Sequence, residues 1–274
     1  MDFNNISKPF LRWAGGKSWL LKYLPDFLTQ DFANYHEPFL GGAAVFLNLQ
    51  PTNKSFLSDL NPELIETYCA LRDDPQKIIS ELRKFKNTKE EYYKIRSASY
   101  RNECRKAARF IFLNQTSFNG IYRVNLNGEY NVPYGYRQKS IFDKDNLLAI
   151  SNLLKRADIA DGDFFKIVSK NVKKNDLVFL DPPYTVTHNN NGFIKYNQKL
   201  FSLDDQYRLS RLIDVIRAKG AYYILTNAAH KTIEEIFEKG DRKIELKRNS
   251  NIGGLMAQRG QYEEFLFTNL QTSK

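Results

Sequence analysis

The sequence contains little cysteine or histidine and has no long apolar run. Its 274 residues include two cysteines and three histidines, Cys69, Cys104, His36, His188 and His230. The two thiols match no metal or redox spacing and the histidines are scattered, so we expect no metal site and a reducing compartment. No apolar run approaches the roughly 18 residues that a bilayer span needs, and the first residues lack a secretory pattern. We therefore expect a cytoplasmic protein with no membrane partner.

A nucleotide-binding P-loop is also missing, although residues 12–18, RWAGGKS, resemble its end. The P-loop pattern is G-x-x-x-x-G-K-[ST], and counting back from Gly16 places its first glycine at Leu11. Residues 18–28, SWLLKYLPDFL, have apolar side chains at helical spacing, which predicts a turn that begins a helix. The start of such a helix and Lys17 would suit an anionic group such as a carboxylate.

Basic and apolar residues are abundant. Hydrophobic residues make up 42% of the chain, which is enough for a sizeable core. Lysine and arginine number 41 against 31 acidic residues, a net charge of +10. This excess favours a polyanionic partner such as nucleic acid, and a generally basic, solvated surface is the alternative that charge alone leaves open.

Alternating strand and helix patterns predict a doubly wound α/β fold. A first strand ends near Glu37, a glycine turn and a helix follow, and a second strand ends at Asp59. Asp59 or Asn61 is predicted to cap the next helix. The alternation resumes with predicted strands and helices at residues 157–168, 176–184, 203–220, 221–227 and 230–240. Residues 242–270 predict two antiparallel edge strands around a basic glycine loop.

The middle of the chain interrupts this alternation. Residues 75–115 have a charged helical pattern, and residues 119–135 alternate apolar and polar side chains around Asn127-Gly128. An Asn-Gly pair between alternating segments is a strong hairpin signal. We therefore predict an inserted recognition domain over residues 73–144, within a catalytic domain formed by residues 1–72 and 145–274.

The segment EPFLGG, residues 37–42, and Asp59 suggest a nucleoside-binding turn. Glycines after a strand let a cofactor approach the backbone, and an acid that ends the next strand can bind ribose hydroxyls. The separation of Gly41 from Asp59, 59 − 41 = 18 residues, is close to the expected spacing. Because G-x-G-x-x-G is absent, a cofactor without a pyrophosphate is favoured. A tight turn with a helix-capping Asp is the alternative.

The segment DPPY, residues 181–184, follows an apolar strand at the position where open α/β sheets bind ligands. Consecutive prolines remove backbone donors and stiffen the turn. The Asp181 carboxylate and Pro182 carbonyl could then accept both protons of an exocyclic amine, while its ring stacks on Tyr184. A proline-stiffened turn with a surface tyrosine is the less specific interpretation.

Taken in order, FLRWAGGK, EPFLGG, the strand ending at Asp59, FNGIYRVN…NVPYG and DPPY resemble the DNA adenine methyltransferase (Dam) family. The resemblance runs from about Phe10 to Asn269. It implies a Rossmann-like class I methyltransferase fold. It also implies methyl transfer from S-adenosylmethionine to adenine N6 of duplex DNA, usually within GATC.

The resemblance also assigns residues. The implied cofactor-binding residues are Trp13, Lys17, Glu37, Gly41, Asp59, Asp163, Phe164 and Asp181, and the implied catalytic residues are Asp181, Pro182 and Tyr184. Lys17 would face the methionine end of the cofactor, so the anion at this lysine is an amino-acid carboxylate. The implied DNA-binding residues are Arg12, Asn119, Ile121, Arg123 and Pro133, with Ile121 as a wedge and Arg123 as a guanine reader. Gln115 departs from the family, which carries a phosphate-contacting arginine there; this predicts weaker backbone contact.

A base that is paired and stacked must be flipped out before its amine can react, so the expected mechanism is base flipping followed by direct transfer. Methylation of cytosine N4, RNA or protein glutamine by the same fold is one alternative, and a catalytically silent DNA-binding module is another. A cognate restriction endonuclease is compatible with the expected function. We expect no obligate protein partner and a location at the nucleoid.

Overall fold

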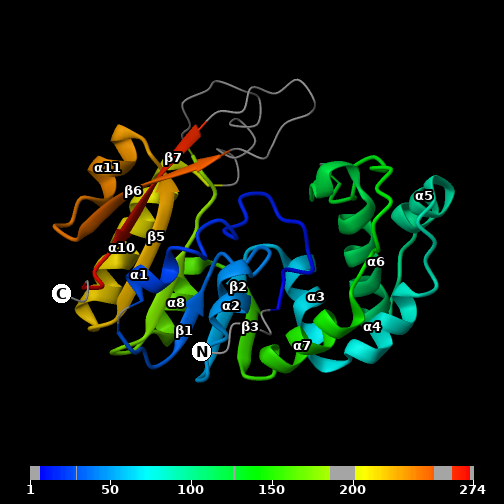
Figure 1. Ribbon diagram of the computed structural model, residues 1–274, viewed down its shortest axis with the longest axis horizontal. Coiled ribbons are helices and arrows are strands. Elements are labelled where there is room, and N and C mark those ends of the chain that lie inside the picture. The colour runs from blue at the N-terminus through cyan, green and yellow to red at the C-terminus, as the bar shows by residue number, and fades with distance from the viewer. Residues whose placement is uncertain (1–6, 29, 126, 186–200, 250–260, 272–274) are drawn as a thin grey trace. The chain divides into compact units, whose positions relative to one another are not determined.

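The computed structural model describes residues 7–28, 30–125, 127–185, 201–249 and 261–271 (Figure 1). The chain forms two compact units. Unit 1 comprises residues 1–18 and 40–162, and unit 2 comprises residues 19–39 and 163–274. His188 and the predicted glycine loop at 250–260 lie outside the described residues.

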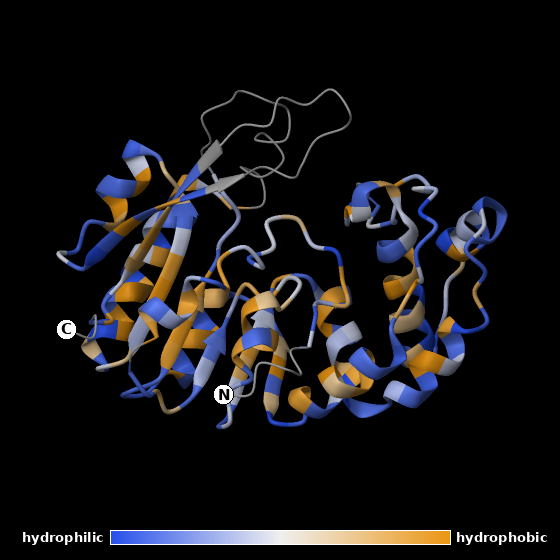
Figure 2. Cartoon of the chain, viewed as in Figure 1, coloured by the Kyte–Doolittle hydropathy of each residue, from blue (hydrophilic) through white to orange (hydrophobic). Residues whose placement is uncertain are grey.

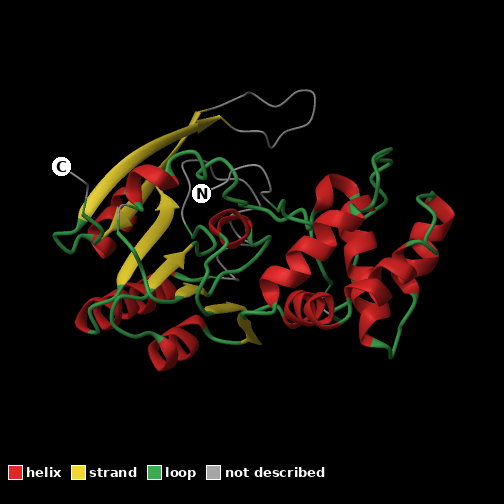
Figure 3. Ribbon diagram, turned by 60° about the horizontal axis from the view of Figure 1, so that its bottom comes forward, coloured by secondary structure: helices red, strands yellow, loops and turns green. Residues whose placement is uncertain are grey.

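Unit 1 is built on two parallel strands, β2 (Ser55–Asp59) and β3 (Ala157–Asp161). Their register pairs Asp59 with Asp161, so both carboxyl ends lie at one edge. The helices of this unit are α2 (Ala44–Leu49), α3 (Pro62–Asp73), α4 (Pro75–Leu82), α5 (Lys89–Ser97), α6 (Glu103–Thr116) and α7 (Lys144–Leu154), with a 3-10 turn, η2, at Phe118–Gly120. All except α2 lie in the crossover between β2 and β3, and Figure 3 shows how strongly helical this part is.

Local sequence sets where these helices begin. As predicted, Asn61 caps α3: its side chain accepts a hydrogen bond from the Leu64 N–H at 3.2 Å. Asp74, Thr88, Asn102 and Asp143 do the same for α4, α5, α6 and α7, which satisfies N–H groups that have no partner inside the helix. The helical prediction for residues 75–115 is therefore confirmed.

The predicted hairpin is present in reduced form. Two isolated antiparallel bridges, Ser117 with Tyr134 and Val124 with Tyr130, replace continuous strands. The pairing stays short because Pro133 lacks a ladder donor and the chain turns at Gly120, whose φ is +63°. The boundaries 73–144 of a separate recognition domain stay a prediction.

Unit 2 has five described strands, β1 (Tyr35–Glu37), β4 (Leu177–Leu180), β5 (Tyr222–Ala228), β7 (Gln261–Thr268) and β6 (Arg242–Asn249), which neighbour one another in that order. The first three are parallel, and β7 is antiparallel to both β5 and β6. The predicted antiparallel pair is thus confirmed. Figure 2 shows β6 as largely hydrophilic, which suits an edge strand that must not pair with another chain.

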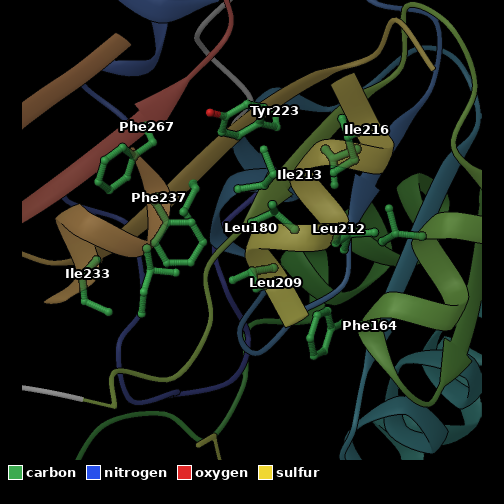
Figure 4. Packing of buried hydrophobic residues seen from close by; sticks show 14 of the residues in the cluster. Phe164, Leu180, Leu209, Leu212, Ile213, Ile216, Tyr223, Ile233, Phe237 and Phe267 are labelled. Carbon is green, nitrogen blue, oxygen red and sulfur yellow. The ribbon is translucent and has the colours of Figure 1, made fainter. Parts of the chain in front are cut away.

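The helices of unit 2 are α1 (Leu24–Phe27), α8 (Phe164–Asn171), α10 (Leu203–Ala218) and α11 (Lys231–Phe237). The core lies where α8, α10 and α11 cover β4, β5 and β7 (Figure 4). Leu209, Leu212, Ile213 and Ile216 are fully buried and share one face of α10, as their spacing predicts. Each such side chain stabilises the fold by about 1.5–3 kcal/mol. The predicted fold class, a Rossmann-like mixed α/β sheet, is confirmed.

The predicted helix over residues 18–28 is much shorter than expected. Turns occupy residues 18–23, and α1 covers only Leu24–Phe27. Pro25 is the cause, because proline has no N–H and its ring clashes with the carbonyl four residues earlier, so it is tolerated only in a first helical turn. No helix therefore begins beside Lys17, and the predicted helix N-terminus cannot bind an anion there.

The structure describes two of the three scattered histidines, and both have local structural partners. His36 lies 2.9 Å from a carboxylate oxygen of buried Asp176, and the His230 side chain caps α11 by accepting from the Thr232 N–H. Within the described ranges, no group of three or more histidine, cysteine or acidic side chains is placed to hold a metal ion. None of the helices that the structure describes has the length and apolar character of a membrane span.

Buried or half-buried tyrosines with hydrogen-bonded hydroxyls occur in both units. Tyr223 donates to Asp241 at 2.8 Å, and Tyr122 donates to Glu63 at 2.6 Å. Burial, and then the acidic partner, raises the pKa of both hydroxyls. Burial also raises the pKa of Tyr130 to about 12. These groups stay protonated in the folded chain at a pH where unfolded tyrosine, with a pKa of about 10, ionises.

The free energy of unfolding is therefore expected to fall as the pH rises above about 10. The unfolded chain then binds fewer protons than the folded chain, so each such tyrosine lowers this free energy by up to about 1.4 kcal/mol per pH unit until its folded pKa is reached. Urea denaturation at about pH 8, 10 and 11 measures the slope. Tyr223→Phe should show a shallower slope, and an unchanged slope in this variant would contradict the assignment.

Candidate active site and DNA-reading loop

The DPPY turn begins where β4 ends. Asp181 directly follows Leu180, which pairs with Leu225 of β5, so the next residue of β5, Thr226, lies beside Asp181. The Thr226 hydroxyl donates to Asp181 Oδ1 at 2.9 Å, and Thr226 is fully buried. A donor fixed on a central strand holds the carboxylate in one orientation. The predicted catalytic acid is thus placed by the sheet itself.

Tyr184, the last residue of DPPY, is also held by a strand. Its hydroxyl donates to the carboxylate of Glu264 on β7, a side chain that is 1% exposed. A buried carboxylate needs a hydrogen-bond partner, and the Tyr184 hydroxyl supplies one here. This hydrogen bond also fixes the position of the Tyr184 ring. Between these two residues, Pro182 is buried, and prolines at 182 and 183 keep the turn stiff. The three predicted catalytic residues therefore come from one rigid turn.

Glu37 ends β1, which is parallel to β4. The carboxyl ends of parallel strands meet at one edge of a sheet, so Glu37 and Asp181 lie at the same edge of unit 2. Glu37 is 3% exposed and accepts a hydrogen bond from the Tyr35 hydroxyl at 2.8 Å. Two acids with different partners thus end neighbouring strands.

Asp163 and Phe164, the predicted contacts of the cofactor adenine, begin α8. Asp163 caps the helix through the Lys166 N–H and forms an ion pair with Arg208 at 2.7 Å. Burial raises the pKa of Asp163, but hydrogen bonds from Arg208 and Lys166 outweigh it and lower the pKa below its usual value. Phe164 belongs to the core, and the Arg208 guanidinium lies 5.0 Å from its ring centre. Arg208 therefore orders both residues.

In unit 1, Asp59 ends β2 and contacts the glycine turn. Its carboxylate accepts the Gly41 N–H and the Asn61 N–H, each at 3.0 Å. Burial raises the pKa of Asp59, although these two N–H groups favour the charged form. A carboxylate has about four lone-pair directions, and these two N–H groups together with that of Leu60 do not use all of them. Asp59 therefore connects the glycine turn to the start of α3, and its role toward a ribose stays a prediction.

Trp13 lies against that turn. Its ring is so close to Gly41 that a Cβ added there would come within 2.7 Å of Trp13 Cδ1. The Trp13 indole also stacks with the rings of Tyr122 and Phe110, at 5.5 Å and 6.4 Å between ring centres. Lys17, also assigned to the cofactor, is 3% exposed and its Nζ donates to the Gly15 carbonyl at 2.9 Å.

Gly41→Ala is expected to weaken binding of S-adenosylmethionine, the cofactor that the sequence resemblance implies, about tenfold, because the methyl group displaces Trp13 and the backbone φ of +47° is strained for alanine. Isothermal titration calorimetry measures this change. Gly240→Ala is the matched control, since Gly240 has a φ of +72° but open space around it. Equal affinities in the two variants would show that the approach of Trp13 to Gly41 is irrelevant to the cofactor.

The predicted DNA-binding residues of the hairpin are fixed by local contacts. Arg123 Nε donates to Asn131 Oδ1 at 2.8 Å on the facing arm. The Ile121 carbonyl accepts from the Tyr130 hydroxyl at 2.8 Å, and the Pro133 carbonyl accepts from the Phe118 N–H at 2.8 Å. Asn119 has a left-handed backbone, with φ of 55°. Arg12, from the N-terminal segment, lies against Gly120 in the same unit.

Gln115, the departure from the family pattern, has a structural role here. Its amide Nε2 donates to the Phe10 carbonyl at 2.7 Å, and its Oε1 accepts from the Arg137 guanidinium at 3.1 Å. Burial and the nearby charge of Arg137 both lower the pKa of Arg12. Two arginines with interacting charges favour a polyanion near this loop.

Sequence reasoning missed the partners that orient the predicted residues: Thr226, Glu264, Arg208 and Asn131. One signal was available. In the strand QYEEFLFT, Glu264 and Leu266 lie two residues apart and therefore on the same face of the strand. A charged side chain on an otherwise apolar face requires a partner. The identity of that partner depends on strand register, which the sequence leaves open.

Residues 13–252 match the model of a protein family described as D12 class N6 adenine-specific DNA methyltransferase. The match covers most of the chain and includes the DPPY turn, Trp13, Asp59 and the hairpin. The chain belongs to this family. It is an adenine-specific DNA methyltransferase whose substrate is DNA and which requires a methyl donor.

Individual relatives agree with the family. The chain is 34% identical to "Type II methyltransferase M1.LlaDCHI" of Lactococcus lactis subsp. cremoris, over 96% of this chain and 95% of that protein. It is 36% identical to "Type II methyltransferase M.MjaIII" of Methanocaldococcus jannaschii, over 93% and 97%. It is 28% identical to a DNA adenine methylase of Vibrio cholerae, over 94% and 95%.

Proposed function

We propose that this methyltransferase moves the methyl group of S-adenosylmethionine to N6 of the adenine in GATC, after flipping that adenine into a pocket formed by DPPY. The observation that carries the proposal is the DPPY turn at the carboxyl end of β4. Its acid is oriented by Thr226 and its tyrosine by Glu264. Preorganised acceptors and a fixed aromatic ring suit a planar base with an exocyclic amine.

The chain's own residues would act on the amine mainly by position. The Asp181 carboxylate and the Pro182 carbonyl accept the two N6 hydrogens, so the nitrogen lone pair is no longer delocalised into the ring and points toward the incoming carbon. Tyr184 stacks on the flipped base. The donor supplies an electrophilic methyl group on a sulfonium, so a sulfur–carbon bond breaks as the N6–carbon bond forms. One N6 proton then leaves along its hydrogen bond to Asp181.

Residues of the glycine turn fit S-adenosylmethionine better than a dinucleotide. Asp59 holds the Gly41 N–H and has lone-pair directions for ribose hydroxyls. The approach of Trp13 to Gly41 leaves no room for a side chain there. Lys17 supplies a cation for the methionine carboxylate. By the same resemblance, the further proposed cofactor-binding residues are Glu37, Asp163, Phe164 and Asp181. A pyrophosphate-binding glycine pattern is absent from the sequence.

We assign recognition of the DNA sequence to the hairpin and to Arg12. Arg123 is exposed and donates to guanine O6 and N7 in the major groove. Ile121, whose carbonyl is held by Tyr130, fills the space left by the flipped base. Asn119, Pro133 and Arg12 contact neighbouring positions of the site. The net charge of +10 supports attraction to the DNA backbone.

Two relatives bear the name type II methyltransferase, which supports pairing with a restriction endonuclease that cuts the same site. In that arrangement the enzyme works on chromosomal DNA in the cytoplasm, at the nucleoid, and needs no obligate protein partner. A solitary enzyme is the alternative. Survival of the host after deletion of the methyltransferase gene would favour the solitary arrangement.

The deciding experiment treats unmethylated plasmid with purified protein and S-adenosylmethionine, then maps modified bases by sequencing. N6-methyladenine confined to GATC is the expected result. Methylation of adenine at another motif would overturn the proposed site and keep the chemistry. Cytosine N4 modification, or cofactor binding without any DNA methylation, would overturn the proposed acceptor. Fluorescence of 2-aminopurine at the target position tests flipping separately, because unstacking raises it.

A further inference from the structure

Asn114 is a fully buried amide in the last turn of α6. Its Oδ1 accepts the Arg12 N–H at 2.7 Å, and its Nδ2 donates to the Arg12 carbonyl at 2.8 Å. Nδ2 also lies 3.4 Å from the Gly120 carbonyl. One side chain thus holds both main-chain groups of Arg12 and reaches the start of the hairpin. The two segments are far apart in sequence.

Gly120 completes this contact from the other side. Its φ is +63°, and a Cβ built there would lie 2.5 Å from Arg12 Nε and 2.6 Å from Arg12 Cζ. The arginine side chain therefore crosses directly over the glycine. Backbone position and side-chain path of Arg12 are set by the same pair of residues, one in α6 and one in the hairpin.

We propose that Asn114 is the positioning residue that makes Arg12 and the hairpin a single DNA-reading element. The inference rests on the proposed function of Arg12 and Arg123. Buried polar groups that are fully paired specify one arrangement of the chain. Asn114 uses its oxygen and both of its N–H donors on these two segments. It touches no base, and its effect on recognition passes through Arg12.

A rigid connection matters because, in the proposed function, Arg12 and Arg123 contact two separate positions of the recognition site. When Arg12 and Arg123 are held at a fixed separation, a wrong base at either position leaves an arginine unpaired in the groove. When the two arginines move independently, each can bind a backbone phosphate instead of a base, and the affinity for DNA becomes less dependent on the DNA sequence. Loss of Asn114 should therefore reduce discrimination more than it reduces DNA binding.

Asn114→Asp tests this with little change in shape. The variant keeps an acceptor for the Arg12 N–H but turns its donor into an acceptor that faces two carbonyls. Discrimination between the cognate duplex and duplexes with one guanine replaced is expected to fall about 10- to 100-fold, measured as a ratio of kcat/KM values. The ratio of binding affinities for the same duplexes, measured by competition, should fall by a similar factor. Asn152→Asp, the same change on an exposed residue of α7, is the matched control.

A double-mutant cycle separates positioning from a general structural role. If Asn114 acts through Arg12, the double variant Arg12→Ala/Asn114→Asp discriminates no worse than Arg12→Ala alone. Fully additive losses, or an equal loss of activity on every duplex, overturn the proposal. If Asn114→Asp does not fold, Gly120→Ala must give the same loss of discrimination, since its methyl group displaces Arg12. Because binding competition needs no catalysis, failure of the methylation assay in the wild type leaves this test decisive.

Discussion

Asp181→Asn is expected to lower the rate of methyl transfer about 1000-fold, while binding of S-adenosylmethionine and DNA changes little. Loss of one preorganised group that stabilises a developing charge typically costs about 100- to 1000-fold in turnover. The replacement here also turns one acceptor into an N–H₂ donor. The N–H₂ group of asparagine would face the N6 hydrogens of the substrate, so no hydrogen bond forms. The N6 lone pair then stays delocalised into the adenine ring. Single-turnover methylation of a cognate duplex measures the effect.

Two further variants make this result specific to the carboxylate. Asp158→Asn changes an exposed acid of β3, paired with Lys54 at 2.7 Å, and is expected to keep wild-type rates. Thr226→Val removes the hydroxyl that orients Asp181 and should lower the rate less than Asp181→Asn does, by about tenfold for the loss of one hydrogen bond to a carboxylate. Full activity of Asp181→Asn with both ligands bound would refute the proposed mechanism.

Arg123→Ala is expected to reduce kcat/KM on the cognate duplex about 10- to 100-fold and to relax the preference for one guanine of the site. A bidentate arginine–guanine contact contributes about 1–3 kcal/mol of discrimination. Arg123 is already oriented by Asn131, so little side-chain entropy is lost on binding. The measurement compares cognate duplexes with duplexes substituted at each position in turn.

A modified base identifies the contact directly. 7-Deazaguanine lacks the N7 acceptor, so it should weaken the wild type at one guanine and leave Arg123→Ala unaffected at that position. Arg156→Ala removes the same charge from an exposed residue beside β3 and should weaken binding to all sequences by a similar small amount. If 7-deazaguanine weakens Arg123→Ala as much as the wild type, Arg123 does not read that base.

Much of the fold followed from local patterns. The strands ending at Glu37 and Asp59, the cap at Asn61 and the antiparallel C-terminal pair were all predictable, because periodicity and capping chemistry act within a few residues. The helix over 18–28 was not, since apolar spacing outweighed the effect of Pro25 in the prediction. The hairpin was foreseen from Asn127-Gly128, but its strands shrank to single bridges.

The candidate site divides in the same way. Residues with distinctive chemistry in short motifs, such as Asp181 and Tyr184, were visible in the sequence. Their partners Thr226 and Glu264 were not, because these meet the turn only through the register of β5 and β7. Asn114 was hidden for a different reason: its contacts join residues 102 positions apart, a distance that no local pattern reports.

The parallel pairing of β2 with β3 has a consequence for how the protein is made. The chain between Asp59 and Ala157 must be synthesised before the two strands can pair. Helices α3–α6 depend largely on contacts with one another and with nearby sequence, and such local contacts form quickly, whereas closing a long loop is slow. During synthesis the helical segment that includes Asn114 therefore emerges from the ribosome while β2 still lacks its neighbour. The edge of β2 that later pairs with β3 is unpaired during that interval, and the length of β2, five residues from Ser55 to Asp59, keeps this edge short.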